Sequence, residues 1–238
     1  ILVEEGKGKI QCIGGGSSIN TADAIRRAKR YREIGADGIM NVVPYYLPPT
    51  KAECIQYFKD LAEAVPELGI ILYNNKMTTQ VLFTDEDFLA LEDVPNFLGS
   101  KMQGGDMWSY LNLIRRTSTK HFPLEQLWGI SNTVKGPGVM ASFIYSCPGF
   151  MMRWWKAIHG GDVQKAITMQ HQVNELLQEV VLPPFFKGAS EVAGTKAFVQ
   201  AMGHWACGGS RRPFFSVDKA EIEKQRRLVK EKYPHFLD

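Results

Sequence analysis

A tyrosine and a lysine that end two successive apolar segments are the residues of this sequence best suited to chemistry. Tyr73 ends the segment 70–73, and Lys101 ends the segment 97–101. If both segments are strands of one parallel sheet, their carboxyl ends lie at the same edge and the two side chains can converge. Apolar surroundings disfavour the ammonium form of a lysine, so its neutral amine can attack a ketone and form an imine. A protonated imine withdraws electrons and permits carbon–carbon cleavage or formation, or loss of water, while a nearby tyrosine relays protons.

Short apolar segments alternate with amphipathic segments through the first 150 residues. Helices are predicted over 24–34, 51–65, 85–91 and 107–114, and strands over 10–13, 38–43, 70–73, 97–101, 127–130 and 141–145. This alternation is typical of a parallel sheet that is covered by helices. A closed barrel has no unpaired edge but needs eight strands, two more than these six. The chain opens without Met on the helix-like residues 1–6, so we expect the first two β/α units to precede it.

After residue 150 the sequence predicts helices almost throughout, over 151–158, 163–181, 191–202 and 219–232. We therefore predict an α/β fold, a (β/α)8 TIM barrel with C-terminal helices. Residues 1–150 would hold strands 3 to 8, and residues 151–238 would form the helical part of the same domain, since no linker or repeat separates them. Residues 132–138 join the last two predicted strands without room for a full helix, so either that helix is shortened or residues are absent there.

Composition excludes several classes of partner. The net charge of +3 is too small to favour nucleic acid or a membrane surface, and the apolar runs fall short of the ~18 residues of a spanning helix. The four cysteines form no C-x-x-C pair, which favours reduced thiols in the cytoplasm. His204 and Cys207 have no second pair of ligands beside them, so we predict no metal site.

Four ordered segments carry a family resemblance: 35–38 leading into 42–46, then 72–74, then 99–101, then 160–162. In this order they resemble the dihydrodipicolinate synthase/N-acetylneuraminate lyase superfamily of class I aldolases. The resemblance implies a barrel enzyme that binds pyruvate as an imine on Lys101, with Tyr73 as proton shuttle and no other cofactor. It also implies that Tyr46 reaches across a subunit interface to complete the proton relay, and hence a homo-oligomer, a dimer or tetramer. The G-T-T-G-E-type loop that binds the pyruvate carboxylate in this family is not in the sequence.

The second substrate, an aldehyde, is less well specified. Dihydrodipicolinate synthases carry an arginine where this chain has Thr78 and usually a glutamate where it has Met102. Because a bidentate arginine is hard to replace at a carboxylate site, lysine biosynthesis is disfavoured. Residues 207–215 resemble the C-R-P-P-[YF] segment of hydratase-aldolases, which cleave benzylidenepyruvates to an aromatic aldehyde and pyruvate. The predicted substrate-binding residues are Asn75, Thr78, Met102 and Phe143, with Trp128 and Tyr145 as further aromatic candidates on the later strands.

Other interpretations stay open. A dihydrodipicolinate synthase or a sialic acid-like sugar-acid lyase would use the same imine, and hydroxyl-rich substrates would need polar partners such as Asn75, Thr79 and Gln103. A non-catalytic barrel that binds 2-oxo acids is the alternative of another class. Tyr46 is as compatible with an ordinary loop aromatic residue as with a relay. Lys135 and Lys196 are rival amines, although neither follows a convincing strand.

Overall fold

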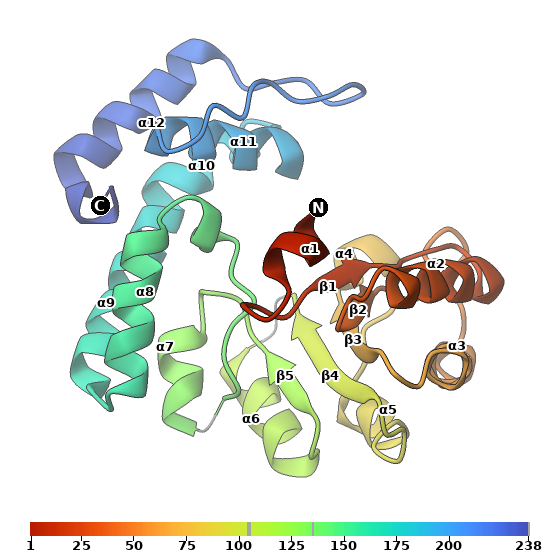
Figure 1. Ribbon diagram of the computed structural model, residues 1–238. Helices are drawn as coiled ribbons and strands as arrows, with labels where there is room; N and C mark the ends of the chain where they lie inside the picture. The colour runs from red at the N-terminus through yellow and green to blue at the C-terminus, as the bar shows by residue number, and fades with distance from the viewer. Residues whose placement is uncertain (104–105, 135, 238) are drawn as a thin grey trace. The chain divides into compact units, whose positions relative to one another are not determined.

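The computed structural model describes residues 1–103, 106–134 and 136–237, and these divide into two compact units (Figure 1). The sheet unit comprises residues 1–124 with 134–138, and the helical unit comprises residues 125–133 with 139–238. The sequence placed the change from strands to helices at residue 150, whereas the structure places it near residue 125.

The sheet unit is built on five parallel strands in the order β1-β2-β3-β4-β5. Their bounds are β1 Ile13–Gly15, β2 Gly38–Asn41, β3 Gly69–Asn74, β4 Phe97–Met102 and β5 Lys120–Phe122. The helices of this unit are α1 Leu2–Gly6, α2 Thr21–Glu33, α3 Lys51–Ala64, α4 Lys76–Thr79, α5 Asp85–Leu89 and α6 Met107–Arg116. Each strand lies beside the next strand along the chain, so all carboxyl ends meet at one edge of the sheet.

Capping residues fix where the two long helices of this unit begin. The Asn20 side chain accepts a hydrogen bond from the Asp23 amide at the start of α2. Thr50 and Glu53 form a reciprocal capping box at the start of α3, which satisfies two backbone donors that would otherwise be unpaired. Gly35 follows α2 with φ of +81°, a conformation that an L side chain rarely adopts.

One face of the sheet packs against α2, α3, α5 and α6, and we call it the helix-covered face. Its core centres on Phe58 of α3, whose ring makes edge contacts with Phe83 and Phe97. The buried residues that form this core include Ala24, Ala28, Ile39, Leu61, Ile70, Leu72, Phe88 and Leu113. Successive residues of a strand point to opposite faces, so Tyr73 and Lys101 point away from the face that holds their neighbours Leu72 and Ser100.

A one-residue irregularity in β4 sets this arrangement. Ile70 pairs with Phe97, but Ile71 pairs with Gly99, so Leu98 is an extra residue on β4. Beyond it the register is regular, with Tyr73 paired to Lys101. A Cβ at Gly99, where φ is +136°, would lie 1.7 Å from the Lys120 carbonyl oxygen, so only glycine fits where β4 meets β5.

Two of the six predicted strands are wrong. Residues 127–130 belong to the short helix α7, Trp128–Ser131, and residues 143–145 form the 3₁₀ helix η2, Phe143–Tyr145. The Trp128 ring packs against Trp154 with 4.8 Å between centroids, and such short apolar runs read alike as buried strand or buried helix. The strand β5, in turn, was not predicted. With five strands in the described part of the chain, β1 and β5 are the sheet's edges, and the eight-stranded barrel is not confirmed.

The helical unit holds the predicted C-terminal helices. Its longer helices are α8 Pro148–His159, α9 Val163–Leu176, α11 Glu191–Met202 and α12 Lys219–Lys232. The remaining segments of this stretch are η1 Asn132–Val134, the π-helical turn η3 Leu177–Val181, α10 Pro183–Phe186 and η4 Pro234–Phe236. Trp154 and Phe150 lie at the centre of this unit's core, and Phe150 stacks on Phe236. Within the described ranges, no helix has both the length and the apolar character to cross a membrane.

Candidate active site

Tyr73, Lys101 and Phe122 form a single row across three neighbouring strands. Lys101 pairs with Tyr73 of β3 on one side and with Phe122 of β5 on the other. Residues in register on adjacent strands point to the same face, so the lysine lies between two aromatic side chains. The row stands at the carboxyl ends of the strands, where the sequence predicted that Tyr73 and Lys101 converge.

The lysine amine lies over the face of the tyrosine ring. Lys101 Nζ is 4.3 Å from the Tyr73 ring centroid, and both side chains are half-buried. The negative face of an aromatic ring attracts a cation by ~0.5–2 kcal/mol, depending on desolvation. The ring therefore offers a surface suited to the positive charge that a protonated imine would carry at this nitrogen.

The tyrosine hydroxyl is held by the residue that follows β4 by one position. Tyr73 Oη donates a hydrogen bond to Gln103 Oε1 at 2.9 Å. The backbone amide of Gln103 donates a hydrogen bond to the Asn74 backbone carbonyl at 3.0 Å, which continues the β3–β4 ladder past the end of β4. The side chain and the backbone amide of Gln103 thus bind the last two residues of β3, Tyr73 and Asn74.

Asn74, next to Tyr73, fixes the loop that leaves β3. Its side chain is buried, donates to the Phe83 carbonyl at 3.0 Å and accepts from the Phe83 amide at 2.9 Å. The enclosed loop contains two predicted substrate-binding residues. Asn75 caps α4 by accepting from the Met77 amide, and Thr78, an exposed residue, donates its hydroxyl proton to the Asn75 carbonyl. Asn75 and Thr78 therefore lie together, directly after the strand that carries Tyr73.

A buried polar group lies behind the row, on the helix-covered face. Ser100 Oγ and His121 Nδ1 are 2.8 Å apart, and the hydroxyls of Thr117 and Thr119 lie near His121 Nε2. The imidazole also packs edge-on against Phe88. Burial lowers the pKa of His121 to about 4, because the charged form loses its hydration. The ring is therefore neutral at physiological pH and connects β4, β5 and α6 as a hydrogen-bonding group.

The two other predicted substrate-binding residues are Met102 in the sheet unit and Phe143 in the helical unit. Met102 follows Lys101 and points to the opposite face, where its sulfur lies 3.1 Å from Ser100 Oγ and 3.6 Å from Asn74 Nδ2. Phe143 belongs to the helical unit, where it is buried and packs against Phe198. Met102 was expected near Lys101, but as the next residue of the same strand it points to the opposite face. Phe143 was expected on a strand, and it lies in η2.

The remaining predicted residues are an aromatic residue and two rival lysines. Tyr46, in the loop after β2, is 77% exposed. Lys196 donates from Nζ to the carbonyls of Cys207 and Gly209, at 3.0 and 2.7 Å, and these hydrogen bonds connect α11 to the following loop. Lys135 lies outside the described residues. In the parts of the chain that the structure describes, no three His, Cys, Asp or Glu side chains are grouped to hold a metal ion.

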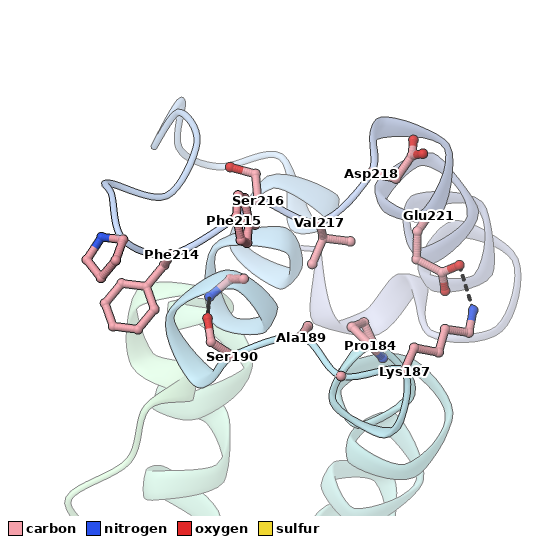
Figure 2. Close-up of a pocket in the computed structure, with 13 residues that line it drawn as sticks. Pro184, Lys187, Ala189, Ser190, Phe214, Phe215, Ser216, Val217, Asp218 and Glu221 are labelled. Carbon is pink, nitrogen blue, oxygen red and sulfur yellow. Dashed lines mark hydrogen bonds and ion pairs between the residues drawn. The ribbon is translucent and has the colours of Figure 1, made fainter.

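The helical unit has a pocket of about 470 Å³ that contains none of the predicted residues (Figure 2). Phe214, Phe215 and Val217 line it on one side, and Pro184 and Ala189 on another. The lysine that lines it, Lys187, forms an ion pair with Glu221 at 2.8 Å.

Comparisons with known proteins agree with the resemblance. The model of the Dihydrodipicolinate synthetase family matches residues 1–232. The chain belongs to this family. A 4-hydroxy-tetrahydrodipicolinate synthase of Cyanothece sp. is 28% identical over 226 residues, which cover 93% of this chain and 74% of that protein. Its counterpart in Methanoculleus marisnigri is 26% identical, with coverage of 95% and 76%.

Solved structures of the family show the same fold. Dihydrodipicolinate synthase from Acinetobacter baumannii, complexed with pyruvate, superposes with a TM-score of 0.84 at 25% identity and covers 96% of this chain and 77% of that one. The structure of PhdJ bound to a substrate intermediate also gives 0.84, at 23% identity, with 96% and 73% coverage. The α/β architecture on a parallel sheet is therefore that of the family. Its members are aldolase-type carbon–carbon lyases, the enzyme class that the sequence predicted.

Phe122 is the residue of this site that the sequence did not reveal. The segment Lys120-His121-Phe122 has no apolar alternation, and it is a strand only because it pairs with β4. Its one sequence signal is distance from Lys101, since a helix of the length of α6 followed by a turn brings the chain back to the sheet near residue 120.

Proposed function

We propose that this chain is an imine-forming pyruvate lyase in which Lys101 is the amine that forms the imine and Tyr73 is the proton shuttle. The observation that carries the proposal is the position of Lys101 Nζ, 4.3 Å from the Tyr73 ring centroid. That contact joins a lysine near the carboxyl end of β4 to a tyrosine whose hydroxyl is already in a hydrogen bond. No cofactor beyond the covalent imine is needed for this chemistry.

The reaction proceeds through an imine and an enamine. Lys101 Nζ adds to the C2 carbonyl of the 2-oxo acid, and the carbinolamine loses its hydroxyl as water to give the protonated imine. When the C3–C4 bond breaks, its electron pair moves toward the imine and forms an enamine, while the C4 hydroxyl gives up its proton and becomes an aldehyde. Protonation at C3 and addition of water to the imine then release pyruvate and restore the amine. Tyr73 moves protons at the carbinolamine and at the C4 oxygen.

The hydratase-aldolase type of reaction fits this site best. Benzylidenepyruvate takes up one water across its C3–C4 double bond and then divides into an aromatic aldehyde and pyruvate. Phe122 lies directly beside Lys101 and offers an aromatic surface to such a substrate. Asn75 and Thr78 are uncharged groups after β3, suited to a hydroxyl or carbonyl rather than to a second carboxylate.

A second candidate is 4-hydroxy-tetrahydrodipicolinate synthase, because the relatives from Cyanothece sp. and Methanoculleus marisnigri carry that name. It would use the same imine but condense pyruvate with an aldehyde that bears another carboxylate. Assays of benzylidenepyruvate cleavage, sialic acid-type cleavage and condensation with aspartate semialdehyde, each followed by pyruvate, separate the candidates. We expect the first reaction to dominate. Preference for either of the others would reassign the aldehyde and leave Lys101 in place.

Oligomeric state and location belong to the same proposal. The exposed Tyr46 is available to a second copy of the chain, as expected if the protein is a dimer or tetramer that shares this residue between sites. The four cysteines, Cys12, Cys54, Cys147 and Cys207, are thiols rather than disulfides, which supports the cytoplasm as the compartment.

Borohydride reduction in the presence of pyruvate tests the imine. Reduction converts the imine to a stable secondary amine, so intact mass and peptide mapping should locate the adduct at Lys101. The Lys101→Arg variant should lose the adduct, and Lys196→Arg, a matched change in the helical unit, should keep it. An adduct on Lys196 or Lys135, or none on the unaltered chain, would contradict the proposal.

A further inference from the structure

Gln103 is the residue whose side chain holds the Tyr73 hydroxyl. Its side-chain oxygen accepts the Tyr73 hydroxyl proton at 2.9 Å, in a half-buried environment. A phenol has a single proton, so the hydrogen bond to Gln103 fixes the direction in which the Tyr73 hydroxyl donates. In this arrangement Gln103 sets the position and orientation of the hydroxyl group.

The backbone makes Gln103 a rigid support. Its amide donates to the Asn74 carbonyl, and Asn74 is itself clamped to Phe83 by two hydrogen bonds. The residue that holds the tyrosine hydroxyl is thus fixed to the strand that carries the tyrosine. A proton-transfer group works best when its geometry is set before the substrate arrives, since no reorganisation is then needed during reaction.

We infer that Gln103 is a positioning residue: it acts through the Tyr73 hydroxyl and sets the rate of proton transfer without being needed for the imine itself. The inference rests on the proposed function, because it takes Tyr73 to be the proton shuttle. It goes beyond that function by separating two properties of the site, namely formation of the covalent adduct and the speed of proton transfer.

The first test compares these two properties in one variant. Gln103→Met keeps the length of the side chain but removes the acceptor. With pyruvate as the probe, the borohydride-trapped adduct at Lys101 should reach the same final amount as in the unaltered protein. Exchange of the pyruvate C3 protons with D2O, followed by NMR, should slow by about tenfold, a part of the effect of a complete acid–base group. Gln56→Met makes the same change on the exposed surface of α3 and should alter neither quantity.

The second test asks whether Gln103 acts through Tyr73. In a Tyr73→Phe background there is no hydroxyl to hold, so Gln103→Met should slow exchange by less than about twofold further. Gln103→Glu retains an acceptor and should restore exchange to within about threefold of the unaltered rate. Equal losses from Gln103→Met in both backgrounds, or loss of the final adduct in Gln103→Met alone, would overturn the inference. Absence of an adduct on the unaltered protein would instead refute the proposed function, so the two failures are distinguishable.

Discussion

Ser100 Oγ and His121 Nδ1 are joined by a 2.8 Å hydrogen bond between β4 and β5, on the face of the sheet opposite Lys101. Each of the two residues immediately precedes a member of the row at the candidate site: Ser100 precedes Lys101, and His121 precedes Phe122. The hydrogen bond therefore helps to hold two of the three strand ends at a fixed spacing.

Acid should weaken the folded state through His121. The pKa of this buried imidazole is lowered from 6.5 to about 4, so in the folded protein it stays neutral in a pH range where the unfolded chain binds a proton. The unfolded state then binds more protons, and stability is lost as pH falls from 6.5 toward 4. The loss attributable to His121 should be about 3 kcal/mol by the lower limit of that range.

Urea unfolding of wild type and His121→Asn, followed by circular dichroism at about pH 7 and about pH 4.5, measures this contribution. His121→Asn should be less stable near neutrality, yet lose about 2–3 kcal/mol less than wild type on acidification. His171→Asn alters an exposed histidine of the helical unit and should follow wild type. Parallel losses in wild type and His121→Asn would mean that the imidazole does not titrate as described.

Removal of the Tyr73 hydroxyl should slow turnover without unfolding the protein. Tyr73→Phe keeps the ring under Lys101 Nζ and deletes only the donor to Gln103. We expect kcat to fall by ~10²–10⁴-fold, the usual contribution of a general acid–base group. Tyr31→Phe deletes a hydroxyl of the same unit that donates to the Gly15 carbonyl, and its activity should stay near wild type. If Tyr73→Phe loses less than about threefold, the hydroxyl is structural.

Phe122 should matter for aromatic substrates more than for the imine. Phe122→Leu keeps an apolar side chain beside Lys101 but loses the ring, and aromatic pairs contribute ~0.5–1.5 kcal/mol beyond burial. The ratio kcat/KM for benzylidenepyruvate should fall by up to about tenfold, while the borohydride adduct with pyruvate is unchanged. Phe214→Leu, a matched change in the helical unit, should leave both readings alone. Loss of the pyruvate adduct in Phe122→Leu would show that the ring shapes the lysine site itself.

Tyr46 offers a test of shared sites. If the Tyr46 hydroxyl acts in the site of a neighbouring subunit, Tyr46→Phe should lower kcat by ~10²-fold. Subunits of Tyr46→Phe mixed with inactive Lys101→Arg subunits should then regain about a quarter of wild-type activity, because half of the sites in mixed dimers combine an intact lysine with an intact tyrosine. If the mixture stays inactive while exchange of subunits is demonstrated by mass, Tyr46 acts within its own chain or not at all.

The sequence allowed the central part of the site to be predicted but not its borders. The apolar segments 70–73 and 97–101 form β3 and β4, as predicted. The predicted spans of α11 and α12 also match the structure, because each helix has a periodic apolar pattern and a capping residue. The segment 127–130 has no such period. The Gln170 side chain accepts a hydrogen bond from the Gly129 backbone amide. The two residues are 41 positions apart, so the pattern of residues 127–130 gives no sign of this contact.

The phase of β4 could not be predicted for a related reason. A regular strand would be expected to carry its alternation from Phe97 onward, and only the pairing of Ile71 with Gly99 reveals the extra residue. Pairing is a property of two segments together, so the phase of β4 is not encoded in its own six residues.

Because of the extra residue Leu98, the face to which the Lys101 amine points depends on the pairing register of β4. If β4 continued the register of Ile70 with Phe97 unbroken, Tyr73 would face Ser100, and the Lys101 side chain would turn into the space between sheet and helices. A chain without Leu98 would keep the amine beside Tyr73, because Gly99 would then follow Phe97 in an unbroken ladder. Among relatives of this chain, a one-residue insertion or deletion between Gly99 and Lys101 is accordingly a stronger sign of lost activity than loss of the residue at position 98.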